Sequence, residues 1–387
     1  MLHLRHRIVS HILSSSSSTS AISPLHRLLS AAAAAAPISP TQGFAVEDYL
    51  VDACGLTRPQ ALKASKKLSH LNSPAKPDAV LAFLAGLGLS GADAAAVVAK
   101  DPLFLCAGVE RTLAPVVDGL TGLGLSRPEI ARLVSLVHSR FRRRSIVPKL
   151  EYYLPLFGSF HSFLRASQRA CYLLSSDLDK VVKPNVMFLR ECGLADCDIT
   201  KLCISEPRLL GNKLERVQAM VARAEGLGVP RGSRMFKVAI QAVAFLNEEK
   251  IANKVDYLKK TFGWSDAEVV VALSMAPMLL NRSKDILQRR FEFLVSEVGL
   301  QPGYIAHRPV FLYYSLEGRI KPRCYVLKFL KENRLLDRDW SFYTAVTRPE
   351  KYFIKKCICP YKESAPHLAE DYAAACRGEM PSNFRFT

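Results

Sequence analysis

Arginine and lysine side chains gather in four places in this sequence, and the chemistry that suits them is the binding of phosphate. The densest cluster begins at residue 140, where five cations fall within ten residues and no acid stands among them. A guanidinium can bridge two phosphate oxygens, so we favour the arginine-rich clusters, and Arg142, Arg143 and Arg144 above all. The alternative for each cluster is a solvated helix face. The candidate phosphate-binding residues are Arg140, Arg142, Arg143, Arg144, Lys149, Arg282, Lys284, Arg289, Arg290, Arg319, Lys321, Arg323, Lys355 and Lys356.

Aromatic residues lie beside two of these clusters and could stack on unpaired bases. Tyr313 and Tyr314 precede the cluster that starts at Arg319, and Tyr352 and Phe353 precede the last one. Stacking on aromatic side chains is a general way to hold single-stranded nucleic acid. Packing in the hydrophobic core is the alternative, and we favour it for all four. No motif reads a base edge, so no target sequence is predicted.

Motifs for catalysis or metal binding are missing from the sequence. It contains no glycine-rich phosphate loop, no His-Glu-x-x-His helix and no paired Cys-x-x-Cys motifs. Cys357 and Cys359 with His367 come nearest to a metal site, but a tetrahedral site normally draws on two ligand pairs. We therefore predict no enzyme activity, no cofactor and no metal.

The composition of the chain indicates a folded protein with a polyanionic partner. Of 387 residues, 49% are hydrophobic and 23% charged, so the chain can bury a large core. Lys and Arg number 53 against 35 Asp and Glu, a net charge of +18. Nucleic acids and anionic membranes are the commonest partners of such a surface. The ten cysteines are scattered through apolar stretches, which indicates a reducing compartment without disulfides.

The elements that must position the basic clusters follow from a repeat of about 35 residues. Glycine returns at positions 88, 124, 158, 193, 228, 263 and 299. Such a glycine can end one helix in the left-handed conformation. An apolar residue follows, and in three units a serine comes next with an acid three residues later, which predicts an N-terminal capping box for the next helix. Those pairs are Ser90 with Asp93, Ser126 with Glu129, and Ser265 with Glu268. Asn333 is expected to replace an eighth glycine.

A proline about fourteen residues after the glycine is expected to close the helix that the serine opens. Pro102, Pro207 and Pro277 occupy that place, and Pro309 comes earlier in its unit. An apolar pair follows each of the first three and predicts a tight turn packed between neighbouring units. The pairs are Leu103-Phe104, Leu209-Leu210 and Leu279-Leu280. Each unit is thus a helix, a tight turn and a second helix, and we predict an all-α curved solenoid of about eight units.

These motifs carry a resemblance to a known family. The Gly-apolar-Ser start, the proline-closed helix with its apolar pair and the repeat length resemble the mitochondrial transcription termination factor (mTERF) family, and its plant members most. The tail from Trp340 to Cys376 is similar to the aromatic-rich C-terminal segment of plant members, so the likeness covers roughly residues 75–380. The resemblance implies a crescent of paired helices that binds double-stranded nucleic acid in organelles and acts in transcription, its termination or transcript processing.

Four regions are expected along the chain. Residues 1–46 are rich in Arg and Ser and free of acids, which is typical of an organelle-targeting leader, largely disordered. The opening arginines favour the mitochondrion slightly over the chloroplast, and a plain disordered tail is the alternative. A helical lead-in (47–76), the repeat array (77–335) and a C-terminal helical cap and tail (336–387) follow. The apolar stretch 79–99 is interrupted by glycines, so we expect no membrane span, and we expect a monomer.

Three functions remain open at this point. The first is regulation of organellar transcription by binding double-stranded DNA along a basic concave face, with the organellar transcription machinery as a further partner. The second is RNA binding for intron splicing or for rRNA or tRNA maturation. The third is a protein-interaction scaffold, because helical solenoids often bind polypeptides.

Overall fold

The computed structural model describes residues 44–169, 172–206, 208–336 and 340–379, and every regular element in these ranges is a helix. The all-α architecture expected from the repeats is confirmed. Most of the expected leader, together with Cys171 and Pro207, lies outside these ranges. No helix among the described residues has the length and apolar character needed to cross a bilayer.

Each unit has a first helix, which follows a turn glycine, and a second helix, which leads to the next glycine. The first helices are α6 (Gly91–Lys100), α8 (Arg127–Phe141), α10 (Phe160–Arg169), α13 (Asp196–Ser205), α15 (Phe236–Val243), α17 (Asp266–Met275) and α19 (Pro302–Ala306). The second helices are α5 (Ala75–Gly86), α7 (Ala114–Gly122), α9 (Ile146–Phe157), α12 (Lys183–Glu191), α14 (Leu214–Gly226), α16 (Glu248–Phe262), α18 (Lys284–Ser296) and α20 (Lys321–Glu332). First helices pack on first helices and second on second, as in α6 with α8 and α12 with α14, so the array has two layers.

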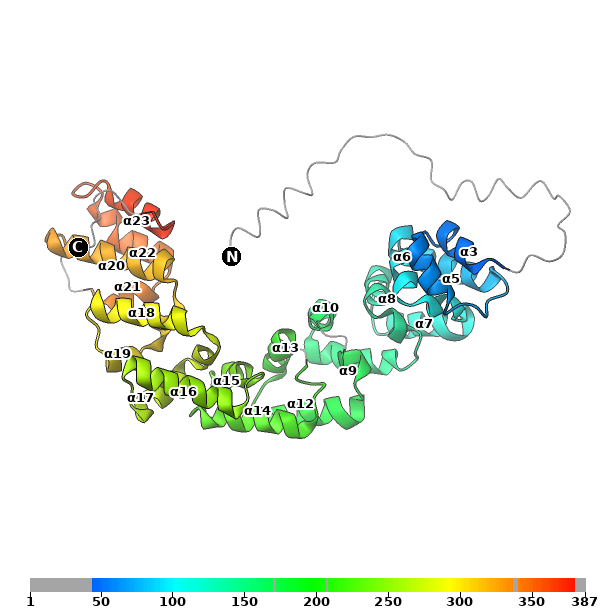
Figure 1. Cartoon of the computed structure of the whole chain (residues 1–387), viewed down its shortest axis with the longest axis horizontal. Helices are drawn as coiled ribbons and strands as arrows, with labels where there is room; N and C mark the ends of the chain where they lie inside the picture. Colours follow the sequence, from blue (N-terminus) through cyan, green and yellow to red (C-terminus); the bar gives the residue numbers. More distant parts are fainter. Residues whose placement is uncertain (1–43, 170–171, 207, 337–339, 380–387) are drawn as a thin grey trace.

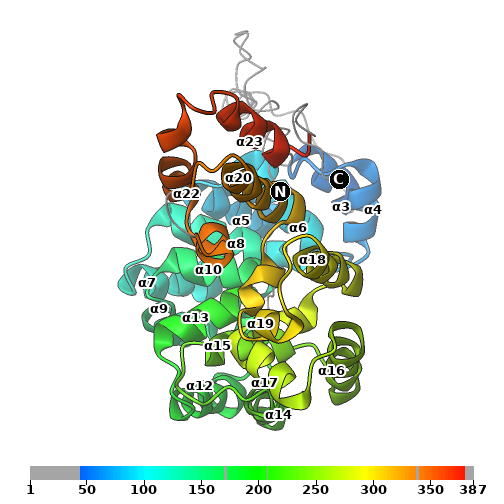
Figure 2. The same ribbon diagram turned by 90° about the vertical axis from the view of Figure 1, so that its left-hand side faces the viewer.

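The two layers bend into a crescent (Figure 1). Helices α10 and α13 lie on the inner side of the bend, and α12 and α14 on the outer side. In Figure 2 the bend is again at α12 and α14, and both arms rise from it. The tip of one arm carries α3 (Val46–Asp52) and α4 (Arg58–Ser65), and the other carries α23 (Leu368–Cys376). The first helices near the bend therefore lie on the hollow side of the crescent.

The turn glycines end the second helices, as predicted. All seven have left-handed φ angles, between +66° and +90°. The apolar residue that follows closes the helix end with its N–H; Leu89, for example, donates to the Leu84 carbonyl at 3.1 Å. Ser126 and Ser265 then form the predicted capping boxes, and Ser90 accepts a hydrogen bond from the N–H of Asp93.

The prediction for the eighth turn is wrong by one residue. Asn333 has a helical φ of −85°, and Arg334 takes the left-handed conformation with φ +53°. The apolar residue after the turn sets this register, because Leu335 N–H donates to the Leu330 carbonyl at 2.9 Å. The Asn333 side chain instead donates to the Phe329 carbonyl at 2.8 Å. The half-buried Leu335 thus decides where the helix ends.

Prolines open the tight turns between the two helices of a unit. Three 3-10 turns begin at a proline: η1 (Pro102–Cys106), η4 (Pro277–Asn281) and η5 (Pro309–Tyr313). The buried pair is the second and third residue after the proline. In η1 it is Phe104 and Leu105, while Leu103, expected to belong to the pair, is 38% exposed. A 3-10 turn has three residues per turn, so the residue next to the proline faces outward here.

A C-terminal cap covers the last unit. It consists of α21 (Phe342–Thr347), α22 (Glu350–Cys357), η7 (Cys359–Tyr361) and α23. Phe353, Leu368 and Tyr372 of the cap form a hydrophobic cluster with Val326 and Leu330 of α20. A solenoid needs such a cap because its last unit otherwise exposes an apolar face.

Candidate nucleic-acid interface

The connections between helices divide into two edges of the array. The proline edge joins each first helix to the following second helix, through residues 100–114, 141–146, 169–183, 205–214, 243–248, 275–284 and 306–321. The glycine edge joins each second helix to the next first helix, through residues 86–91, 122–127, 157–160, 191–196, 226–236, 262–266 and 296–302. Because the helices alternate in direction, each kind of connection lies on its own side of the array.

Positive charge is concentrated on the proline edge. Its seven connections contain 15 Lys and Arg and seven Asp and Glu, whereas the glycine edge contains three and four. Three of the four predicted clusters lie in or beside proline-edge connections, and the fourth lies on α22 of the cap. The structure therefore brings candidates from distant repeats to one edge.

Within the densest cluster the arginines differ in their environment. Arg142 is held by two hydrogen bonds, of 3.1 and 3.2 Å, to the carboxylate of Asp101 in the preceding connection. Arg144 donates to the Arg111 carbonyl at 3.2 Å. That oxygen lacks a helical partner because the residue four positions later is Pro115, which has no N–H. Arg143 and Arg144 are exposed, and Arg140 is half-buried.

Two candidate residues face the interior instead of solvent. The Lys149 ammonium donates to the carbonyls of Leu174 and Ser176, both at 2.8 Å. Burial first, and then the charge of Arg140, lower the pKa of Lys149. Arg290 in α18 donates to the Leu312 carbonyl at 2.6 Å. Their donors stabilise the next connection, a role that the sequence analysis did not predict.

The same arrangement recurs in other second helices. Asn185 donates to the carbonyls of Leu210 and Asn212, at 3.0 and 2.7 Å. The ammonium of Lys254 donates to the Arg282 carbonyl. Four residues share this position, eight or nine residues before a turn glycine: Lys149, Asn185, Lys254 and Arg290. The carbonyls that accept their hydrogen bonds lie 22 to 28 residues further along the chain. A polar side chain at this repeat position thus ties successive units together, and we call these four residues the inter-repeat donors.

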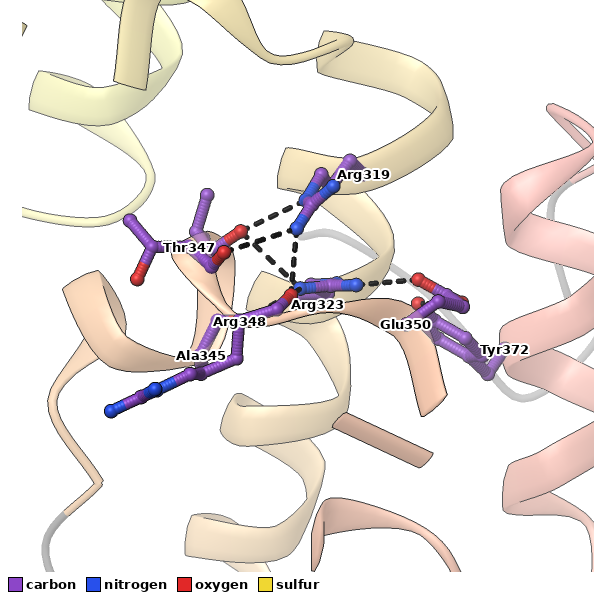
Figure 3. Close-up of polar contacts among 8 residues, drawn as sticks. Arg319, Arg323, Ala345, Thr347, Arg348, Glu350 and Tyr372 are labelled. Carbon is purple, nitrogen blue, oxygen red and sulfur yellow. Dashed lines mark hydrogen bonds and ion pairs between the residues drawn. The ribbon is translucent and has the colours of Figure 1, made fainter. Parts of the chain in front are cut away.

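Arg319 and Arg323 make an equivalent connection to the cap (Figure 3). Arg323 is fully buried, and its guanidinium donates to the carbonyls of Ala345 and Arg348, both at 2.7 Å. Its other terminal nitrogen is 2.5 Å from the Glu350 carboxylate. Arg319 donates to the carbonyls of Val346 and Arg348, at 2.8 and 2.7 Å. Both arginines were candidates for phosphate binding, and both instead hold internal carbonyls.

Tyr372 completes this network. Its hydroxyl donates to the second carboxylate oxygen of Glu350 at 2.6 Å. Burial tends to raise the pKa of Glu350, but the hydrogen bonds from Tyr372 and Arg323 outweigh it and lower the pKa. Glu350 is therefore ionised at neutral pH, and its charge is balanced by Arg323.

The remaining candidates are accessible. Lys321 is half-buried and forms an ion pair with Glu317. The other five are exposed: Arg282, Lys284, Arg289, Lys355 and Lys356. Arg282 lies 5.6 Å from the Tyr313 ring centre, and Lys284 lies 5.0 Å from that of Tyr257. These contacts fix the cations beside aromatic faces without removing them from solvent.

The aromatic candidates divide into three groups. Phe353 is fully buried and belongs to the core, the role that we favoured. Tyr313 and Tyr314 are half-buried, with the rings against Arg282 and Arg319. Tyr352 is 38% exposed on α22.

A row of basic residues on the inner helices was not predicted from the sequence. Arg132 in α8, Arg165 in α10 and Lys201 in α13 are exposed and stand seven or eight residues after their turn glycines. Arg132 and Arg165 line a cavity of about 610 Å³ together with His161. Each of these three units supplies one cation, so no run of charge marks the row in the sequence. Aligning the units by their glycines is the signal that finds it.

Metal binding has no support among the described residues. No group of three or more His, Cys, Asp and Glu side chains there could hold an ion. Cys357 is buried in the cap core, while Cys359 is exposed, and both are free thiols.

The sequence is similar to a known protein family and to several of its plant members. Residues 136–353 match the family model described as mTERF. The chain is 27% identical over 108 residues to transcription termination factor MTEF18, mitochondrial, of Arabidopsis thaliana, which covers 28% of this chain and 19% of that protein. Transcription termination factor MTERF8, chloroplastic, of the same plant is 22% identical over 151 residues, 39% of this chain and 30% of that protein.

A third relative is similar to this chain over a longer stretch of residues. Transcription termination factor MTERF15, mitochondrial, of Arabidopsis thaliana is 24% identical over 183 residues, 47% of this chain and 40% of that protein. The matches therefore span less than half the length of each of these relatives.

Proposed function

Because this chain belongs to the mTERF family, we propose that it binds double-stranded DNA in an organelle and thereby regulates transcription, at termination or a related step. The named relatives are transcription termination factors of mitochondria or chloroplasts. We favour the mitochondrion for this chain, on its arginine-bearing start, with the chloroplast as the alternative.

The observation that carries the proposal is the charge difference between the two edges. Phosphate groups of a duplex repeat along its length, and cations repeated along one edge of a crescent match that pattern. A solvated surface without a polyanionic partner has no need of this asymmetry. The four acids of the glycine edge balance its three cations, whereas the proline edge keeps its excess.

The residues divide into two roles in this proposal. Phosphates contact the exposed and half-buried cations that lie in or beside the proline edge and on the cap, with the inner row as a second line of contacts on the concave side. The inter-repeat donors, with Arg319 and Arg323, keep successive connections at a fixed spacing. The phosphate-contacting set is Arg132, Arg140, Arg142, Arg143, Arg144, Arg165, Lys201, Arg282, Lys284, Arg289, Lys321, Lys355 and Lys356.

The mechanism requires no reaction at the protein. A protein bound over several turns of duplex blocks the path of the organellar polymerase or offers it a docking surface. Contacts to phosphate fix position along the duplex but carry no base information, so target choice depends on groove contacts or on duplex shape. The protein acts as a monomer in this account, because each unit contributes its own contacts.

RNA binding is the second candidate, and the exposure of Tyr352 favours it. An aromatic ring at the surface suits unpaired bases, which transcripts offer more often than duplex DNA does. Splicing or maturation of an organellar transcript would then be the function, again without catalysis by the protein.

The test is crosslinking of the tagged protein in purified organelles, with bound DNA and RNA recovered and sequenced side by side. Enrichment of a few duplex DNA sites supports the proposal. Enrichment of one transcript with DNA at background supports the RNA candidate. Recovery of neither nucleic acid contradicts both, and leaves a protein-binding scaffold.

A further inference from the structure

Helix α22 of the cap exposes aromatic, aliphatic and cationic side chains to solvent. Tyr352 is 38% exposed and Ile354 37%. Lys351, Lys355 and Lys356 on the same helix are exposed as well. Phe353 and Cys357, four residues apart, point into the cap core and anchor the opposite face.

Among the residues that the structure describes, no ion pair compensates the cations of this face. Glu350 is the one acid within α22, and its carboxylate is bound by Arg323 and Tyr372. Arg348, just before the helix, is exposed and its guanidinium lies 5.4 Å from the Tyr352 ring centre. Tyr352 has Lys355 and Lys356 three and four residues further along, so these cations share its side of the helix.

We propose that the face of α22 defined by Arg348, Lys351, Tyr352, Lys355 and Lys356 binds a single-stranded segment of nucleic acid. The inference deepens the proposed function and rests on it. The array holds the duplex, and the cap holds an unpaired strand where it leaves the duplex.

The aromatic ring distinguishes this ligand from a duplex. Phosphate binding alone calls for cations, and in a duplex the faces of the bases are stacked on one another and closed to a side chain. An unpaired base offers its face, and a tyrosine ring beside an arginine is a suitable stacking partner. Trp340 lies 6.4 Å from the Tyr352 ring, centre to centre, and supports it from one side.

The position of the face agrees with this role. Helix α22 lies at the tip of one arm of the crescent, beyond the last repeat unit (Figure 1). A strand that separates from a duplex at the end of the array would meet this surface first. The cations beside Tyr352 can then contact the phosphates on either side of a stacked base.

The experiment uses the full chain and two kinds of fluorescent DNA probe. One is a blunt duplex of about 25 base pairs, and the other is the same duplex with about ten unpaired thymidines, placed at one end or the other. We expect the extension to tighten binding by about tenfold, a typical gain for one stacked base. Tyr352→Ala should remove that gain and leave binding of the blunt duplex unchanged. Tyr352→Phe should keep the gain, since phenylalanine stacks without the hydroxyl.

A matched control is Met187→Ala, which truncates another exposed apolar side chain, 58% exposed, on α12. It should behave as the unaltered protein on both probes. The proposal is overturned if neither extension improves binding, or if Tyr352→Ala weakens both probes equally.

The outcomes also separate this inference from the proposed function. Failure of the unaltered protein to bind the blunt duplex contradicts the duplex function alone. A Tyr352-dependent affinity for the isolated thymidine strand would still support the site. A photocrosslinker placed at residue 356 that captures protein from an organelle extract, and no nucleic acid, would overturn it.

Discussion

The guanidinium of Arg323 is fully buried and lies 2.5 Å from the carboxylate of Glu350, whose side chain is half exposed. A buried cation needs this partner, because the carbonyls that accept hydrogen bonds from one terminal nitrogen of Arg323 do not balance its charge. The pair joins the last repeat helix to the cap, so the cap and the array are expected to unfold together.

Removal of the Glu350 charge should therefore loosen the cap. Glu350→Gln is expected to destabilise the protein by about 2 kcal/mol, since it leaves the Arg323 charge unbalanced in the interior. Thermal unfolding, with limited trypsin digestion to locate the loosened segment, measures the effect. Glu363→Gln, at an exposed acid of the same cap, serves as the control. Equal stability of both variants would show that the pair does not hold the cap.

Lys254 gives the stability a pH dependence. Burial, and then the nearby charge of Lys284, lower the pKa of Lys254 to about 8. Above that pH the Lys254 side chain has released its proton in the folded state. In the unfolded state it keeps the proton up to the usual lysine pKa near 10.5. Stability from this group therefore rises with pH between about 8 and 10, by at most about 1.4 kcal/mol per pH unit. Urea unfolding at pH 7, 8 and 9 should show a smaller rise for Lys254→Met than for the unaltered protein and for the exposed-site control Lys250→Met.

The turn glycines differ in what an added methyl group would meet. At Gly228 a Cβ would lie 2.9 Å from the Val270 Cγ1 atom, whereas at Gly88 it would meet open space. Both have positive φ, which costs an alanine roughly 1 kcal/mol. Gly228→Ala should therefore destabilise by about 1 kcal/mol more than Gly88→Ala, measured by chemical denaturation. A smaller effect at Gly228 would mean that α17 moves aside freely.

Lys149 should affect nucleic-acid binding without contacting the ligand. Lys149→Met leaves the carbonyls of Leu174 and Ser176 without their donor, so we expect a stability loss of roughly 1–3 kcal/mol. Duplex affinity should fall as the connection shifts, but the salt dependence of binding should stay the same, because no phosphate contact is lost. Fluorescence titration of a duplex at several salt concentrations tests this. A shallower salt dependence in Lys149→Met would assign Lys149 to the phosphate contacts.

Local features of the sequence predicted most of the fold. Glycine conformation, serine caps and proline turns depend on residues close together in the chain, so their spacing reveals the repeat. The errors arose where a contact, and not the type of the residue, decides the outcome. Leu335, by reaching the carbonyl of Leu330 inside the core, moves the last turn from Asn333 to Arg334.

The candidate site was less predictable for the same reason. Four cations resemble phosphate-binding residues in the sequence, but each donates to carbonyls at least 22 residues away. They are Lys149, Arg290, Arg319 and Arg323. A run of charge cannot distinguish a cation that faces solvent from one that faces the next unit. Arg132, Arg165 and Lys201 illustrate the converse, because isolated cations form a row only after the units are stacked.

The most direct test of the account is the slope of log affinity against log salt for a duplex, compared between the two edges. The unaltered protein should show a slope near −5 if about six phosphates are neutralised. Arg143→Ala, on the proline edge, should reduce the slope by about 0.9, and Arg234→Ala, at an exposed arginine of the glycine edge, should leave it unchanged. A nearly flat salt dependence, or an equal change in both variants, would contradict the claim that the proline edge binds the phosphates.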